Sequence, residues 1–269
     1  MDGIAKTAYY CCGVRMLDAQ REHPLCGDQL AARFMDGEAL AYFEHFRRFT
    51  LANAGNAARH RIIDDLLRER LRNDPANCIV LLGAGFDTRA FRLRGGTWWE
   101  FDQPALIERK EAVLPQAQAP NPLLRVGIDF AVDRLEDRMA PLRGTASAVV
   151  VLEGVCMYLE RPALAQTLVA LQRLLPGHAL ACDLMNAAFV RRVAGAVRSQ
   201  VASLGARFAT TRADPAAEFL ERGYRLASSQ SIALRTMELG GVRRFPPWVM
   251  GTLLRSLRDG YRVCMFQAP

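Results

Sequence analysis

A short, entirely apolar segment that ends in a glycine turn constrains the fold of this chain more than any other feature. Residues 78–82 read Cys-Ile-Val-Leu-Leu and continue directly into Gly83-Ala84-Gly85. A segment that is apolar on both faces predicts a strand buried inside a parallel sheet. Glycines directly after such a strand let the backbone turn tightly and approach a ligand without a clash at Cβ. We therefore expect a ligand crevice at this turn.

Strand-like and helix-like segments alternate after the glycine turn. Helical stretches at 103–114 and 161–175 separate some of the strand candidates, and this alternation predicts βαβ units with a parallel sheet. Two later strand candidates predict a terminal antiparallel pair, so the expected fold class is α/β, a Rossmann-like, doubly wound and mostly parallel sheet. The candidate strands after the turn are Thr97–Phe101, Leu123–Ile128, Ala146–Leu152, His178–Leu184, Tyr224–Ser231 and Tyr261–Gln267.

The length of 269 residues predicts one large α/β domain that carries helical insertions. Residues 1–75 contain helical patterns and no strong strand, including the longer helix Asn53–Leu71 with one apolar face. Residues 187–208 predict a helical insertion, and we interpret Phe245-Pro246-Pro247-Trp248 as a packing loop. The expected segments are an N-terminal helical cap (1–75), a ligand-binding core (76–185), a lid or insert with a late strand (186–248) and a C-terminal helix and strand (249–269).

Composition excludes several classes of protein. The net charge is +7, and all but two of the 35 basic residues are arginines. These arginines are spread along the chain without a basic cluster, which argues against nucleic-acid binding. The seven cysteines are odd in number and include no C-x-x-C pair, so neither a disulfide framework nor a zinc site is expected. Without a secretory signal or a long apolar run, we expect a cytoplasmic protein that does not enter membranes.

Acidic residues stand at the ends of three of the expected strands. The dinucleotide pattern would place a third glycine where Thr88 stands, and this weakens a nicotinamide interpretation of the turn. Asp102 could accept hydrogen bonds from both hydroxyls of a ribose, or it could cap the helix that begins near Pro104. Glu153 ends a central strand among apolar neighbours, where a carboxylate faces the ligand crevice.

Four blocks of the sequence resemble the leucine carboxyl methyltransferase family, which includes bacterial natural-product O-methyltransferases. The first block runs from Val80 through the glycine turn to Leu93, and the other three agree with the family in order and spacing. The resemblance covers roughly residues 5–185 and implies a class I fold that binds S-adenosyl-L-methionine (SAM), with a helical lid. The other three blocks are residues 56–65, residues 99–104 with Lys110, and residues 152–159.

The resemblance also implies roles for individual residues. Arg59 matches the arginine that pairs with the SAM carboxylate, with Arg61 as the alternative if the register is wrong, and Lys6 matches a second carboxylate-binding cation of some members. Tyr158 could line the acceptor pocket or pack in the core. The remaining matches are Gly83 and Gly85 under the methionine part of SAM, Asp102 at the ribose, Asp129 with Phe130 at the adenine, and Glu153 near the amino group.

The expected activity is methyl transfer from SAM to an oxygen of a small natural-product-like acceptor. A carboxylate is already a nucleophile, whereas a hydroxyl needs a general base. The four histidines offer no clear base, so we favour carboxyl methylation and assign no catalytic residue. The alternatives are protein C-terminal carboxyl methylation, a nicotinamide-dependent oxidoreductase, and a non-catalytic binding module. The acidic residues Asp102, Asp129 and Glu153 argue against the last of these.

Overall fold

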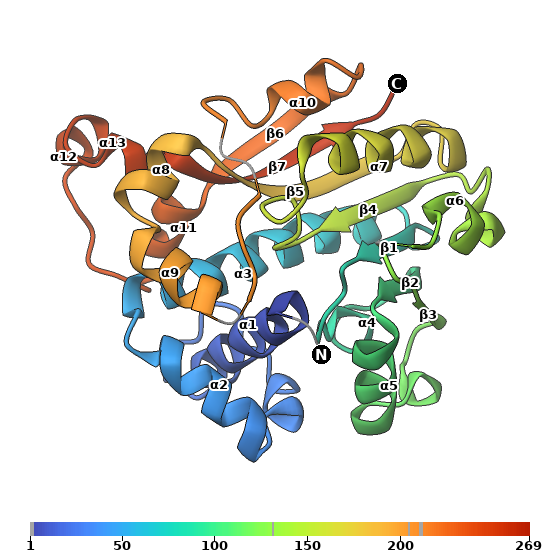
Figure 1. Cartoon of the computed structure of the whole chain (residues 1–269), viewed down its shortest axis with the longest axis horizontal. Helices are drawn as coiled ribbons and strands as arrows, with labels where there is room; N and C mark the ends of the chain where they lie inside the picture. The colour runs from blue at the N-terminus through green and yellow to red at the C-terminus, as the bar shows by residue number, and fades with distance from the viewer. Residues whose placement is uncertain (1–2, 131, 204, 210–211) are drawn as a thin grey trace.

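A seven-stranded sheet forms the centre of the protein (Figure 1). The computed structural model describes residues 3–130, 132–203, 205–209 and 212–269. Along the sheet the strands follow the order β3-β2-β1-β4-β5-β7-β6. Their bounds are β1 (Cys78–Leu82), β2 (Thr97–Asp102), β3 (Leu123–Gly127), β4 (Ala148–Leu152), β5 (Ala179–Met185), β6 (Arg225–Ser231) and β7 (Tyr261–Gln267).

The strand directions confirm the expected fold class. Strands β1 to β5 pair in parallel, and Val80 of β1 lies between Trp99 of β2 and Val150 of β4. The last strand of the chain, β7, lies between β5 and β6 and runs antiparallel to both. The chain proceeds from β1 toward β3 on one side and crosses to β4 on the other. The crevice of a doubly wound sheet opens at such a switch point, at the carboxyl ends of the strands.

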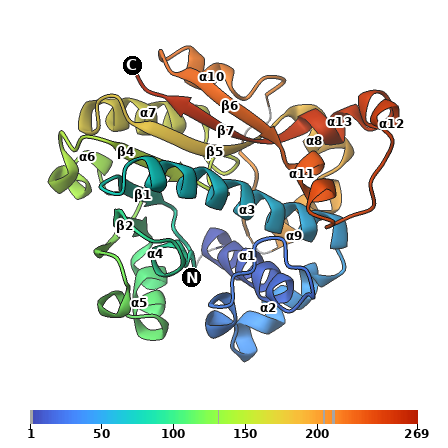
Figure 2. The ribbon, with the colours of Figure 1, turned by 180° about the vertical axis from the view of Figure 1, so that it is seen from behind.

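Helices cover both faces of the sheet (Figure 2). On one face the apolar side of α3 (Thr50–Asn73) buries Ile62, Ile63 and Leu67 against β1 and β4. On the other face α7 (Arg161–Leu174) buries Leu168 and Leu171. Shorter helices extend these layers: α4 (Arg89–Arg92), α5 (Pro104–Val113), η2 (Gln116–Gln118), α6 (Leu135–Arg138), η3 (Ala140–Leu142), α8 (Ala187–Arg192), α10 (Ala217–Leu220), α11 (Ile232–Glu238), α12 (Pro247–Gly251) and α13 (Arg255–Gly260).

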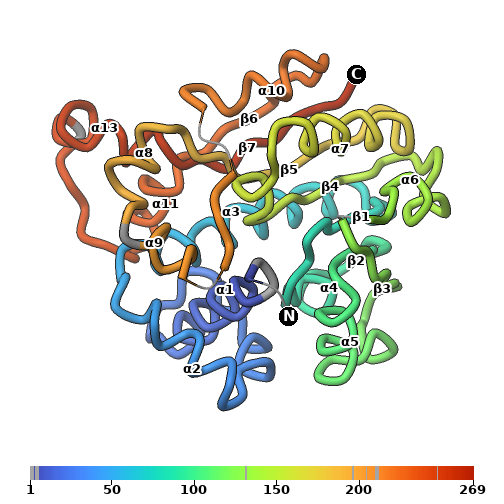
Figure 3. Tube along the Cα trace, viewed as in Figure 1, coloured from blue at the N-terminus to red at the C-terminus, as the bar shows by residue number. Residues whose placement is uncertain are grey.

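A third apolar cluster joins distant parts of the sequence. It combines α1 (Gly3–Ala19), η1 (Ala31–Phe34) and α2 (Gly37–Arg47) with residues around α9 (Gly195–Ser203). These helices lie together in the tube view (Figure 3). The ring of Phe86, in the loop after the glycine turn, has its centroid 4.8 Å from that of Tyr9 and 4.9 Å from that of Phe34. The cluster therefore attaches the N-terminal helices to the end of the sheet where the crevice opens.

The helical segments differ in part from the expectations. The segment 187–208 is helical as expected, but it forms two short helices, α8 and α9, of which the second begins at Gly195, a poor helix former. The helix α2, which was not expected, starts because the side chain of Asp36 accepts a hydrogen bond from the Ala39 N–H at 3.0 Å. Phe245 and Trp248 do not pack as expected: their side chains are 46% and 67% exposed.

None of the helices in the described part of the chain is both long enough and apolar enough to cross a membrane.

Candidate active site

A cavity of about 370 Å³ opens at the carboxyl ends of β1, β2 and β4. This volume lies within the range of small-molecule sites. The cavity brings together every site residue expected from the sequence except Lys6. The expected residues that line it are Arg59, Gly83, Gly85, Asp102, Asp129, Phe130, Glu153 and Tyr158.

The glycine turn forms the floor of the cavity. Gly83 and Gly85 have φ angles of +72° and +46°, in the left-handed region that other residues rarely adopt. A Cβ on Gly83 would lie 2.5 Å from Cγ2 of Val155. The Gly83 N–H donates to the carbonyl oxygen of Phe101 at 2.8 Å, which fixes the turn to the end of β2. Both glycines are therefore required by the backbone at this position.

Asp102 supports the same turn from the end of β2. Its Oδ2 accepts the Gly85 N–H at 2.6 Å, and its Oδ1 accepts the Gln103 N–H at 2.7 Å. The N-cap of α5 is Gln103, so the interpretation of Asp102 as the helix cap is wrong. Burial raises the pKa of Asp102, and the two backbone N–H groups oppose that rise. The carboxylate is thus held on the cavity wall by backbone dipoles, and among the described residues it forms no salt bridge.

The wall after β3 is more open. Asp129 and Phe130 line the cavity and are both exposed, Phe130 to 47%. The Asp129 N–H donates to Oδ2 of Asp133 at 2.9 Å, a contact within the loop that follows β3. This edge therefore borders solvent, whereas Asp102 is buried.

Arg59 projects from α3 into the opposite end of the cavity. Its Nε lies 3.1 Å from Oε1 of Glu153, and its Nη1 lies 3.2 Å from Oδ2 of Asp183. The same Nη1 donates to the hydroxyl oxygen of Tyr261 at 2.7 Å. Arg61 instead pairs with Asp65 and does not line the cavity. The structure therefore places Arg59, and not Arg61, at the cavity.

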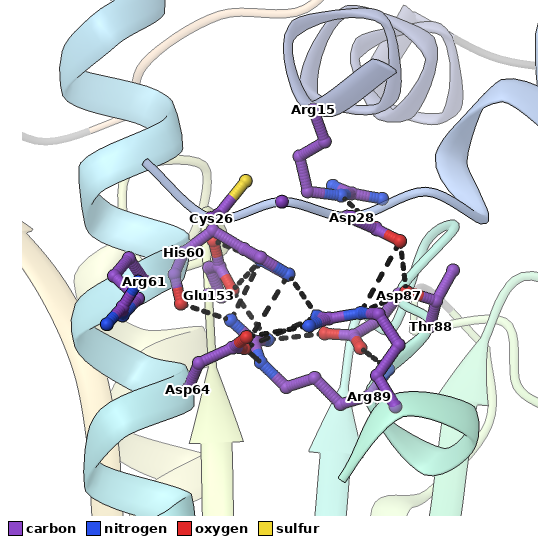
Figure 4. A network of polar contacts seen from close by, with 12 residues as sticks. Arg15, Cys26, Asp28, His60, Arg61, Asp64, Asp87, Thr88, Arg89 and Glu153 are labelled. Atoms are coloured by element: carbon purple, nitrogen blue, oxygen red, sulfur yellow. Dashed lines mark hydrogen bonds and ion pairs between the residues drawn. The ribbon is translucent and has the colours of Figure 1, made fainter. Parts of the chain in front are cut away.

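A buried network of charges lies directly behind Glu153 (Figure 4). The guanidinium of Arg89 is fully buried, with Nε 2.6 Å from Asp64 Oδ1, Nη1 2.7 Å from Glu153 Oε2 and a further ion pair to Asp87. Burial alone would raise the pKa of Glu153, but Arg89, His60 and Arg59 hold it well below its usual value. Glu153 is therefore ionised at neutral pH.

The network continues outward to the N-terminal helices. Arg92 Nη1 lies 2.7 Å from Asp64 Oδ2, and Arg92 Nε lies 3.4 Å from Asp28 Oδ1. Arg15 of α1 pairs with Asp28 at 2.9 Å and donates to the carbonyl oxygen of Phe86 at 2.7 Å. A continuous chain of alternating charges thus connects the cavity to the helix α1.

His60, Asp87 and Glu153 have the spacing of a metal-binding group, because their ligand atoms all lie within 4.8 Å of one another. The guanidinium of Arg89 already contacts all three of them. A metal cation there would face a fixed positive charge, so this arrangement disfavours a metal.

Tyr158 and Lys6 occupy different surroundings. Tyr158 lines the cavity and also packs edge-on against Phe208 at 5.6 Å between ring centroids, and its place beside an acceptor stays a prediction. Burial raises the pKa of Tyr158, which keeps the phenol protonated at neutral pH. Lys6 does not line the cavity, and its Nζ lies 5.5 Å from the ring centroid of Tyr42.

Sequence reasoning missed the residues that hold the expected ones in place. Asp183 is a charged residue inside the apolar strand β5 and is fully buried; an ionisable residue in such a strand is a signal that could have been used. Arg89 stands directly after the glycine turn and gave no comparable signal. Its importance depends on Asp64 and Glu153, which are distant from it in sequence.

Comparisons with known proteins agree with this architecture. The leucine carboxyl methyltransferase family matches residues 8–172. A Streptomyces coelicolor protein assigned as a SAM-dependent methyltransferase is 32% identical over 75% of this chain and 77% of its own length. A Mycobacterium tuberculosis protein with the same assignment is 31% identical over 61% of this chain, and the match spans 59% of the mycobacterial protein.

Solved structures share the fold at low sequence identity. A DUF574 family protein from Streptomyces avermitilis superposes with a TM-score of 0.59 at 12% identity, covering 96% of this chain and 97% of that one. The magnesium protoporphyrin IX methyltransferase of Synechocystis, solved with S-adenosylhomocysteine, gives a TM-score of 0.51 at 12% identity, covering 90% and 100%. With the family match over more than half of its length, this chain belongs to the leucine carboxyl methyltransferase family.

Proposed function

We propose that this protein is an O-methyltransferase that transfers the methyl group of SAM to a carboxylate or hydroxyl oxygen of a small acceptor. The cofactor is SAM, in keeping with the assigned activity of the relatives. The observation that carries the proposal is the single cavity in which the glycine turn meets Asp102, Asp129 and Glu153 at the ends of three parallel strands.

The donor groups of the cavity fit the chemistry of SAM. Its ribose offers two hydroxyl donors, which Asp102 can accept from the buried wall. Its adenine offers an amino donor, which suits the carboxylate of Asp129, and a ring nitrogen, which suits the backbone N–H of Phe130. The glycine turn lets the backbone lie close to the methionine part, because a side chain on Gly83 would collide with Val155.

The methionine end carries both charges that an amino acid requires. The Glu153 carboxylate can accept from the SAM ammonium group, and the Arg59 guanidinium can donate to the SAM carboxylate. Arg59 is already oriented by Glu153, Asp183 and Tyr261. Lys6, which does not line the cavity, would have to move to contribute as a second cation.

The acceptor is best explained as an oxygen that is already anionic. When bound, SAM would supply an electrophilic methyl carbon, to which the acceptor oxygen bonds as the methyl–sulfur bond breaks and S-adenosylhomocysteine leaves. Among the described residues that line the cavity, Tyr158 is held protonated by burial, and burial with Arg89 lowers the pKa of His60. Asp87 and Glu153 are weak bases because Arg89 pairs with both of them. A carboxylate acceptor needs no base, so this lining favours carboxyl methylation.

The protein contributes positioning and exclusion of water. Methyl transfer is an in-line displacement, so alignment of the acceptor with the methyl group supplies much of the catalysis. We propose that residues 1–50 of the cap (1–75) and the insert (186–248) close over the core (76–185), with 249–269 completing the sheet. Val201 and Ala206 of the insert share the apolar cluster of Tyr9 and Tyr10. If the lid closes on the ligand, amide hydrogen exchange in both segments slows on binding.

Binding and transfer of labelled methyl groups test the proposal. Calorimetry should show S-adenosylhomocysteine binding at micromolar concentrations, roughly −7 to −8 kcal/mol. Methyl-labelled SAM should then label acceptors from a panel of small carboxylic acids and phenols. Tight binding of NADH without binding of S-adenosylhomocysteine would refute the assignment.

The products of the same assay distinguish the acceptor class. Methyl esters release labelled methanol in mild base, whereas aryl methyl ethers do not. Peptides that end in a leucine carboxylate form a separate arm, because protein carboxyl methylation is the alternative use of this family's chemistry. Base-labile label on small acids and not on peptides would support the proposal.

A further inference from the structure

The imidazole of His60 lies beside Glu153 at the cavity lining and is almost completely buried. Its Nδ1 lies 3.3 Å from Oε1 and 3.2 Å from Oε2 of Glu153. Its Nε2 lies 2.8 Å from Nη2 of Arg92. Both ring nitrogens are therefore engaged, and the side chain is 1% exposed.

The neighbours of the ring determine where its proton resides. A guanidinium can only donate, so Nε2 must accept from Arg92. A neutral ring carries one proton, so with Nε2 accepting, that proton lies on Nδ1, where the Glu153 carboxylate can accept it. The other neutral tautomer would set Nε2–H against Arg92 and leave a lone pair facing Glu153. The Nη2 of Arg89 also lies 2.8 Å from Nδ1, but it has a separate acceptor in the His60 carbonyl oxygen at 2.9 Å.

The surroundings of the ring disfavour its doubly protonated form. An imidazolium would add a third positive charge beside Arg89 and Arg92, and Nε2–H would then point at the Arg92 guanidinium. Burial and the charge of Arg89 lower the pKa of His60, although Glu153 and Asp64 oppose this. The ring is therefore neutral at pH 7, with the proton on Nδ1.

We propose that His60 is a positioning residue that orients the Glu153 carboxylate toward the amino group of SAM through its Nδ1–H. This inference rests on the proposed function, because it assigns Glu153 to that amino group. Arg59 contacts Oε1 and Arg89 contacts Oε2, and His60 lies between the two oxygens. Three donors thus fix the carboxylate in one orientation, and its 13% exposed surface faces the cavity with capacity for a further donor.

The test compares two ligands that differ only at this end. S-adenosylhomocysteine carries the amino-acid chain, and 5′-methylthioadenosine lacks it. In His60→Leu the affinity for S-adenosylhomocysteine should fall about tenfold, the effect of losing one charge-assisted hydrogen bond. The affinity for 5′-methylthioadenosine should stay within twofold. His60→Asn, which can place an amide N–H near the position of Nδ1, should lose less.

His178→Leu is the matched control. His178 is also 1% exposed and is bonded to the Leu175 carbonyl oxygen and the Tyr224 hydroxyl, away from the cavity. It should change neither affinity. Equal losses for both ligands in His60→Leu, or no loss for either, would overturn the positioning role. A folded wild-type protein that binds neither ligand would instead overturn the proposed function.

A second measurement does not depend on a folded variant. Nitrogen-15 spectra of histidine-labelled wild-type protein at pH 7 report which ring nitrogen carries the proton. The proposal expects His60 to be neutral with the proton on Nδ1, both with and without S-adenosylhomocysteine. An imidazolium, or a proton on Nε2, would overturn it.

Discussion

The charged side chains at the two ends of the cavity are held in place by different kinds of contact. At the end that we propose binds the methionine part of SAM (the methionine end), Glu153 and Arg59 belong to a buried network in which each charge has two or more partners. At the end that we propose binds the adenosine part (the adenosine end), Asp102 is held by two backbone N–H groups, and Asp129 is exposed. Folding thus fixes the methionine end in advance, whereas the adenosine end relies on the glycine turn and on the ligand.

This difference predicts that substitutions at the two ends have different consequences. A buried charge that loses its partner is strongly destabilising, because the remaining charge stays out of water. A carboxylate held by backbone groups can be removed with less damage to the fold, so its loss should affect mainly binding. Substitutions at the methionine end should therefore lower both stability and ligand binding, whereas substitutions at the adenosine end should lower mainly binding.

The largest effect is expected at Arg89, which holds the methionine end together. Arg89→Met would leave Asp64, Asp87 and Glu153 without their shared partner, and stability should fall by about 3–5 kcal/mol. Urea unfolding measures this loss. The control is Arg68→Met, since Arg68 also pairs with Asp64 but is 42% exposed. It should cost no more than about 1 kcal/mol, and a similar loss in both variants would contradict the comparison.

The second prediction concerns Asp102 at the adenosine end. Asp102→Ala should weaken S-adenosylhomocysteine binding by about 1.5–3 kcal/mol, the effect of lost charge-assisted hydrogen bonds. Asp102→Asn retains one acceptor oxygen and should lose less. Calorimetry measures the affinities, and thermal unfolding should show a folded protein in both variants. Unchanged binding would mean that Asp102 serves only to hold the turn at Gly85.

Much of this architecture could be predicted because it depends on local sequence. The strand β1 and its glycine turn follow from an apolar run and two glycines, and β7 begins and ends at the expected residues, Tyr261 and Gln267. Six of the eight expected residues now seen at the cavity stand within the glycine turn or at or just after strand ends, and the other two are Arg59 on α3 and Tyr158 in the loop after β4.

The rest could not be predicted because it depends on contacts between distant residues. The partners of Arg89 come from α3, from the loop after the glycine turn and from the end of β4. The sequence of each segment alone does not indicate that the three segments lie together in the fold. The exposed Trp248 shows the opposite error, in which a local pattern suggested packing that the fold does not supply.

The third prediction tests the geometry of Arg59. Arg59→Lys keeps the positive charge but cannot form two parallel hydrogen bonds to a carboxylate. It should weaken S-adenosylhomocysteine binding by about 1 kcal/mol, roughly fivefold. Arg61→Lys, on the same helix but outside the cavity, should leave the affinity unchanged. A larger loss in Arg61→Lys than in Arg59→Lys would place the carboxylate elsewhere.

The smallest effect is expected at Asp129, where the adenosine end borders solvent. Water competes for an exposed carboxylate, so its hydrogen bond to the adenine amino group contributes little net free energy. Asp129→Ala should weaken S-adenosylhomocysteine binding by about 0.5 kcal/mol and leave stability unchanged. The contact is tested by the ratio of the affinities for adenosine and for inosine, because inosine lacks the amino group.

If Asp129 accepts from that amino group, wild-type protein should prefer adenosine and Asp129→Ala should lose the preference. Competition calorimetry against S-adenosylhomocysteine measures both ligands under one set of conditions. Asp133→Ala serves as the control, because Asp133 lies in the same loop and holds the Asp129 N–H. A preference retained in Asp129→Ala but lost in Asp133→Ala would mean that the loop backbone, and not the Asp129 carboxylate, recognises the adenine.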